Sequence, residues 1–76
     1  MNVKQWLELT DAAQRAKVAK AAGTTVAYFD QLAGDHRRAS PALAKALVEA
    51  SRKHTPHAVM TFTALRPDLA ALMGAA

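Results

Sequence analysis

Two glycines divide the middle of this 76-residue chain into short segments, and their spacing constrains the fold more than any other feature. Gly23 follows a run of apolar and basic residues, and a left-handed glycine commonly ends a helix. The segment between Gly23 and Gly34 has apolar residues at helical spacing, namely Val26, Phe29 and Leu32. We therefore expect helices over 11–22 and 25–33. The turn between them is too short for an antiparallel pair and suits a steep crossing.

A short helix is predicted over 3–9, because Val3, Trp6 and Leu7 share one helical face. Thr10 is expected to cap the helix of 11–22, with Asp11 at the positive end of its dipole. That helix has an expected inner side made of Ala12, Ala16, Val18, Ala19 and Ala22, and an outer side made of Arg15, Lys17 and Lys20.

A third long segment begins at Ser40-Pro41, where Ser40 is expected to cap a helix and Pro41 to take its first position. The apolar face expected for this helix is Leu43, Ala44, Leu47, Val48 and Ala50, and Arg52 and Lys53 suit its last turn. In the tail we expect an extended segment over 57–60, one helical turn from a Thr61 cap to Leu65, and a last helix over 69–73 capped by Asp68.

Length and composition then set the fold class. A chain of 76 residues is one domain, and its 51% hydrophobic content is dominated by alanine, a strong helix former of small volume. Without cysteine the domain has no disulfides or thiolate metal sites. We expect an all-α, compact bundle of four to five short helices over residues 1–76, with self-association as its further support.

Charge and motifs exclude several function classes. The net charge of +4 and pI near 10 suit a polyanionic partner. No apolar run could span a bilayer, and the first residues lack a signal-peptide core, so a cytoplasmic protein is expected. His36, His54 and His57 lack metal-ligand spacing, and no nucleophile or phosphate loop is recognisable. We therefore expect no metal, no cofactor, no catalytic residue and no enzyme activity.

The stretch from 15 to 34 carries the functional prediction. Ala19 must be small where two helices cross, and Gly23 adopts the backbone of the turn. If Val18, Val26, Phe29 and Leu32 are buried between the helices, the residues that face outward are Thr24, Thr25, Ala27, Tyr28 and Gln31. The N-terminal part of a recognition helix presents such residues to base edges in the major groove.

The order Ala19, Gly23, Phe29, Leu32 resembles the helix-turn-helix of phage Cro- and repressor-type regulators. The loop over 34–41 and the later Leu65-Arg66-Pro67-Asp68 resemble a branch of small prophage regulators, the YdaS type, which includes antitoxins. The resemblance covers roughly residues 3 to 69 and implies a lambda-repressor-like fold that binds operator DNA. Two features depart from it: the helix lacks a run of glutamines, and it carries Asp30, which would repel phosphate.

Each exposed residue of this segment has a functional and a structural interpretation. Gln31 can bond adenine with both amide atoms, or simply be solvated. Thr24 and Thr25 can contact phosphate or a thymine methyl, or cap the helix. Tyr28 can reach a phosphate or a base, or pack on the surface, and Ala27 can let the helix sit deep in the groove.

The basic residues are expected to position the protein rather than to read sequence. Arg37 and Arg38, which follow the recognition helix, can clamp phosphates, or form a solvated loop. Arg15, Lys17 and Lys20 can touch phosphate from the preceding helix, and one or two of them are expected to point the right way. Lys4 is interpreted as ordinary surface.

The tail over 54–76 holds more apolar residues than a four-helix core needs, and we expect part of it to form a homodimer interface. The alternative is packing on its own domain. The sequence thus predicts a Cro-like transcriptional repressor that binds duplex DNA as a homodimer. A toxin-neutralising antitoxin or protein-interaction module is the alternative, and a nucleoid-type binder without sequence preference is a third.

Overall fold

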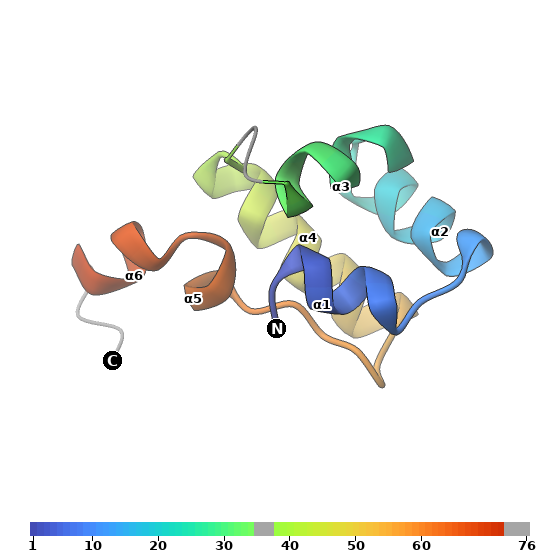
Figure 1. Ribbon diagram of the computed structural model, residues 1–76. Coiled ribbons are helices and arrows are strands. Elements are labelled where there is room, and N and C mark those ends of the chain that lie inside the picture. The colour runs from blue at the N-terminus through green and yellow to red at the C-terminus, as the bar shows by residue number, and fades with distance from the viewer. Residues whose placement is uncertain (35–37, 73–76) are drawn as a thin grey trace.

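The structure is a computed structural model that describes residues 1–34 and 38–72, and within them the chain forms six helices and no strand. The helices are α1 (Val3–Glu8), α2 (Ala12–Ala22), α3 (Val26–Ala33), α4 (Pro41–His54), α5 (Phe62–Leu65) and α6 (Pro67–Leu72) (Figure 1). The prediction of a small all-α bundle is confirmed, with one short helix more than expected.

Reciprocal capping boxes begin the first two helices. At α1 the Asn2 carboxamide accepts the Gln5 N–H at 2.9 Å, while the Gln5 side chain accepts the Asn2 N–H at 3.1 Å. Asp11 and Gln14 repeat the arrangement at α2, with distances of 2.8 and 3.0 Å. Each box satisfies two backbone donors that a helix start otherwise leaves without partners.

The prediction that Thr10 caps α2 is wrong, because Asp11 holds that position. Thr10 is buried, and its hydroxyl donates to the carbonyl of Trp6 at 2.9 Å. The hydroxyl is therefore occupied at the end of α1, one residue before the backbone turns into α2.

The connection from α2 to α3 forms as predicted around Gly23, whose φ of 76° is left-handed. Its N–H lies against the carbonyls of Ala19 and Lys20, and the Thr24 N–H donates to Ala19 at 2.9 Å. These bonds close the end of α2, so α3 begins after only three residues. Thr25 holds the N-cap position of α3 but makes no side-chain cap hydrogen bond.

The core is centred on Trp6 of α1 and Phe29 of α3, both fully buried. Their ring centroids are 5.0 Å apart and the planes meet at 69°, the edge-to-face arrangement that aromatic pairs favour. Small buried residues, among them Ala19 and Ala44, accompany the close packing of α2 on α4. The full core cluster comprises Val3, Trp6, Val18, Ala19, Phe29, Leu47, Ala50, Ala58 and Met60.

Three residues that were expected to be buried are exposed. Val26 is 42% exposed, and Ala12 and Ala16 are exposed as well. Three residues turn an α-helix through about 300°, so Val26 lies about 60° around α3 from Phe29 and at the helix's first position. In α2 the buried residues, Val18 and Ala19, lie in the second half, and the first half extends past the core.

The long helix α4 begins and ends as predicted. The Ser40 hydroxyl accepts the Leu43 N–H at 3.1 Å, with Pro41 at the first helical position. Arg52 and Lys53 lie in the last turn. Of its expected apolar face, Ala44, Leu47 and Ala50 are buried and Leu43 and Val48 are half-buried.

Two buried hydroxyls fix the segment after α4 to the bundle. Thr55 accepts the indole N–H of Trp6 at 3.0 Å, and its hydroxyl also lies 2.9 Å from the carbonyls of Ser51 and Ala58. The Ser51 hydroxyl accepts the N–H of Met60 at 3.0 Å. Met60 is fully buried, so it does not belong to the apolar surplus expected in the tail: the chain needs residues up to 60 to finish its core.

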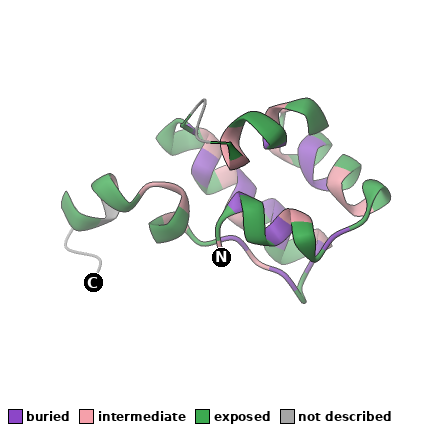
Figure 2. Ribbon diagram, in the orientation of Figure 1, coloured by how far each residue is buried: buried purple, intermediate pink, exposed green. Residues whose placement is uncertain are grey.

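Of the last two helices, α5 still contacts α4, and its Leu65 packs against the core. Thr61 caps α5 as predicted, accepting the Ala64 N–H at 3.2 Å. Asp68 lies in the first turn of α6 rather than capping it, and the predicted end at Met73 lies outside the described residues. Helix α6 contacts chiefly α5 and is largely exposed, with Leu72 at 83% (Figure 2).

Candidate nucleic-acid interface

Helix α3 presents an exposed face beside the connection from α2. Thr25, Ala27 and Gln31 are exposed, whereas Thr24 and Tyr28 are half-buried. Ala27 and Gln31 are four residues apart and so lie one above the other on the helix. The structure thus brings the predicted base-reading residues together along one helix, with Thr25 at its start and Gln31 in its last turns.

Thr24 and Thr25 have different roles in the fold. The Thr24 backbone N–H closes α2, and its side chain is partly covered. Thr25 is exposed, and because its hydroxyl makes no cap hydrogen bond, that hydroxyl remains available to an external acceptor or donor.

Asp30 is also exposed and lies beside Gln31 on α3. A carboxylate disfavours phosphate at this point of the surface. It can, however, accept a hydrogen bond from the amino group of cytosine, as acidic side chains do in the major groove.

The predicted phosphate residue Arg15 is engaged within the protein. It is half-buried, and its guanidinium donates to the carbonyls of Leu7 and Thr10, the latter at 2.8 Å, and to the Thr10 hydroxyl at 3.3 Å. The expectation that Arg15 points outward is therefore wrong. The carbonyls at the end of α1 need donors, and since the last turn of α1 has no basic residue, Arg15 of α2 supplies them. Lys20 is exposed in the last turn of α2, next to the connection.

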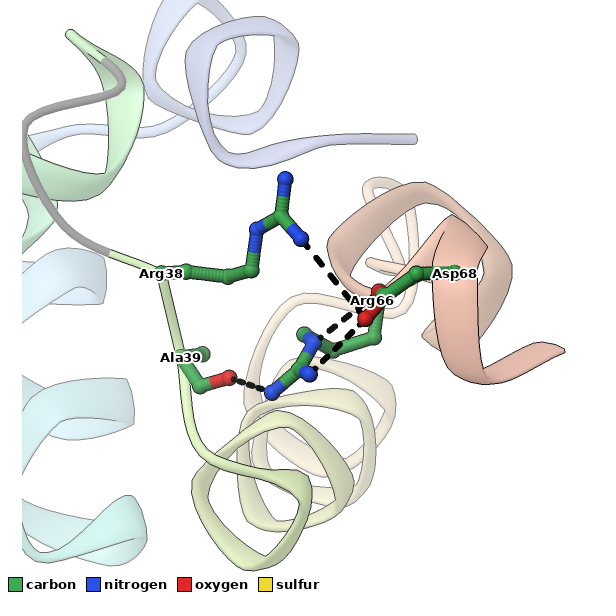
Figure 3. A network of polar contacts seen from close by, with 4 residues as sticks. All are labelled: Arg38, Ala39, Arg66 and Asp68. Carbon is green, nitrogen blue, oxygen red and sulfur yellow. Dashed lines mark hydrogen bonds and ion pairs between the residues drawn. The ribbon is translucent and has the colours of Figure 1, made fainter. Parts of the chain in front are cut away.

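Of the two loop arginines, Arg37 lies outside the described residues and Arg38 belongs to a polar network (Figure 3). One nitrogen of Arg38 is 3.6 Å from a carboxylate oxygen of Asp68. Arg66 holds the same carboxylate through two bonds of 3.1 and 3.0 Å and donates to the Ala39 carbonyl at 2.8 Å. The hydrogen bond from Arg66 lowers the pKa of Asp68 to about 2, so the carboxylate is charged near neutral pH.

Sequence reasoning missed Arg66 and Asp68 as partners of the basic loop. The sequence pattern indicates Asp68 as a helix cap, and it gives Arg66 no role beyond its place in the resemblance. The available signal was their two-residue separation around Pro67, which keeps an arginine and an acid close together in the chain. Nothing in the sequence indicates that Ala39, far away in the chain, completes the network.

Other candidate sites receive little support from the described residues. Among residues 1–34 and 38–72, no three His, Asp or Glu side chains gather where they could hold a metal ion, and His36 falls outside that part. Within the same part, no helix has the length and apolar character needed to cross a membrane. Comparison of the chain with protein-family models, curated proteins and solved structures gives no match.

Proposed function

We propose that this chain is a sequence-specific regulator that binds duplex DNA with a helix-turn-helix formed by α2 and α3, in the manner of the Cro-like repressors it resembles. The observation that carries the proposal is the division of α3: Phe29 anchors the helix in the core, while Thr25, Ala27 and Gln31 are exposed together beside a connection of three residues. A helix held by one face and exposed on the other can be inserted into a major groove.

The proposal gives each exposed group a role. Gln31 reads a base by a bidentate contact, Thr25 bonds a phosphate or meets a thymine methyl, and the small Ala27 allows close approach. Lys20 and Arg38 neutralise phosphates on either side of the helix. The net charge of +4 favours the same partner.

Selection from a random duplex library tests the proposal directly. A specific regulator should enrich a defined site and bind it about 10³–10⁷ times more tightly than random duplex at physiological salt. Equal affinity for selected and random duplex across a salt titration would contradict specific recognition and favour a nucleoid-type binder.

Gln31→Ala then tests the reading residue. The substitution should weaken duplex binding by about 1–3 kcal/mol through one base position, and it should relax selectivity at that position. Thr63→Ala, an exposed polar change on α5, is the control and should leave the selected site unchanged. If Gln31→Ala gave the same base preferences as the control, the assignment of Gln31 would be wrong.

We further propose that the protein binds as a homodimer through α6, on the observation that Leu72 is 83% exposed on a helix that contacts chiefly α5. A two-fold pair would cover this side chain and place two α3 helices on adjacent half-sites. Sedimentation at micromolar concentration should give a dimer for the wild type and for Leu9→Gln, an exposed leucine elsewhere, but a monomer for Leu72→Gln. A monomeric wild type would contradict the dimer.

The same observation also favours a second candidate function, a protein-interaction module of the antitoxin type. Leu72 would then contact a different protein, and the acidic Asp30 on the exposed face of α3 suits a basic partner better than phosphate. Lack of any enriched duplex, together with a monomeric wild type, is the outcome that would favour this candidate over the regulator.

A further inference from the structure

A cleft of about 720 Å³ lies between the start of α1, the end of α3 and the α5–α6 segment. Its apolar walls include Val3, Leu32 and Leu65, and its charged residues are Lys4 of α1 and Arg38 of the loop before α4. No acidic residue lines it among the described residues. Two cations that are distant in sequence therefore border one concave surface, and the described part of its lining contains no carboxylate; such a surface favours an anion.

The carboxylate of Asp68 lies beside this cleft and already binds one of its cations, Arg38, at 3.6 Å (Figure 3). Arg66 holds Asp68 by two shorter bonds and is itself tied to Ala39. The Arg66 side chain is 15% exposed, whereas that of Arg38 is 65% exposed. Arg38 is thus the partner that can leave: among residues 1–34 and 38–72 it would give up one long ion pair, and Asp68 would remain bound to Arg66.

The position of the cleft relates it to the proposed reading helix. Leu32 and Ala33, at the C-terminal end of α3, form part of its wall, and Arg38 follows α3 in the chain. A phosphate held there would lie beside the end of the helix, where a backbone contact fixes the depth and register of the duplex without reading its sequence.

We propose that Lys4 and Arg38 form a two-cation seat for a backbone phosphate of duplex DNA, and that Arg38 moves from Asp68 to this phosphate when the duplex binds. The inference rests on the proposed function. It adds Lys4, which sequence reasoning placed on ordinary surface, and it gives Asp68 the role of an internal anion that competes with the duplex for Arg38.

The first arm of the test compares two exposed lysines of the full-length protein. Lys4→Ala should weaken binding to every duplex alike and reduce the slope of log affinity against log salt by about one unit. Lys45→Ala, on α4 and outside the cleft, has the same charge change and should have a clearly smaller effect on both quantities. Unchanged thermal midpoints would show that both variants are folded.

The second arm tests the competition. Asp68→Asn should raise duplex affinity by up to about fivefold, the range of a surface ion pair. Glu49→Gln, an exposed acid on α4, adds the same charge and should raise affinity less. In an Arg38→Ala background the effect of Asp68→Asn should fall to that of Glu49→Gln, because no arginine remains to be released.

The outcomes separate the two proposals. If the wild type binds duplex but Lys4→Ala matches Lys45→Ala, the seat is overturned and the proposed function stands. If Asp68→Asn acts equally with and without Arg38, the exchange of Arg38 is overturned. If the wild type binds no duplex at physiological salt, the proposed function fails and the seat fails with it as a DNA contact.

Discussion

Replacing Phe29 tests how α3, the proposed reading helix, is held in the bundle. Phe29 is the only fully buried side chain of α3, and its ring meets Trp6 edge to face at 5.0 Å. Truncation to alanine would cost about 3–5 kcal/mol. That is as much as a core of this size supplies, about 3–5 kcal/mol, so Phe29→Ala should unfold the domain. Phe29→Leu keeps most of the volume and loses the aromatic pair, for an expected loss of about 1–3 kcal/mol.

Thermal unfolding followed by circular dichroism measures this loss. For a domain of 60–100 residues, each kcal/mol lowers Tm by about 4–8 °C, so a loss of about 2 kcal/mol should lower it by about 8–16 °C. Well below that Tm, duplex affinity should remain near wild type, because the exposed residues of α3 are unchanged.

Val26→Ala is the matched control on the same helix. Val26 is 42% exposed, and the change should alter stability by no more than about 0.5 kcal/mol. Equal losses from Phe29→Leu and Val26→Ala would refute the packing of α3 described above, because they would place both side chains in the core.

Three further predictions concern the residues whose roles changed between sequence and structure. Arg15→Ala should lower the free energy of unfolding by about 1–3 kcal/mol, since carbonyls at the end of α1 lose their donor, whereas the exposed Lys17→Ala should not; equal urea midpoints would contradict this. Met60→Ala should cost about 2–5 kcal/mol in urea unfolding, and a loss under 1 kcal/mol would mean that the tail is dispensable. Arg66 lowers the pKa of Asp68 from 3.8 to about 2, so the stability from ionised Asp68 is present above about pH 4 and is lost as pH falls toward 2. Urea titrations between pH 5 and 2 should therefore show a shallower acid loss for Asp68→Asn, and an unchanged one would contradict the pairing.

Local signals in the sequence were sufficient wherever a few neighbouring residues decide the structure. Ser40 and Pro41 begin α4, Gly23 ends α2, and Thr61 caps α5, each through bonds within four residues. In such cases the side chain or backbone conformation satisfies nearby N–H or carbonyl groups, whatever the rest of the fold does.

Predictions failed where a distant segment supplies the partner. Periodicity placed Val26 inside, but Phe29 is the residue of α3 that meets Trp6, and Val26 lies about 60° around the helix from it. Arg15 was expected to face solvent, but the end of α1 lies beside it and supplies the backbone carbonyls to which its guanidinium donates. Met60 looked like surplus because its acceptor, the Ser51 hydroxyl, lies inside the preceding helix and gives no periodic signal.

The candidate site likewise has one part decided by neighbouring residues and one part decided by distant segments. The half of the site proposed to read bases, Thr25 to Gln31, consists of α3 and its N-cap residue, and the grouping of these residues was predictable from spacing. Its cationic half is assembled from separate segments, so counting charges could not show which cations the fold uses internally. Arg15 and Arg66 are both engaged with backbone carbonyls.

This division of the cations limits how steeply the proposed duplex binding can depend on salt. Around α3 the described residues leave Lys4, Lys20 and Arg38 exposed. Each phosphate neutralised contributes about −0.9 to the slope of log affinity against log salt, so three contacts give about −3 for one protomer. Two protomers on a palindromic site would give about twice that value. If these three cations alone contact phosphate, a slope well beyond −3 on the selected site requires a second copy, or contacts from Arg37 or from Lys17, which is also exposed on α2. The Leu72→Gln variant separates these sources, since it should reduce the slope only if a second copy supplies the difference.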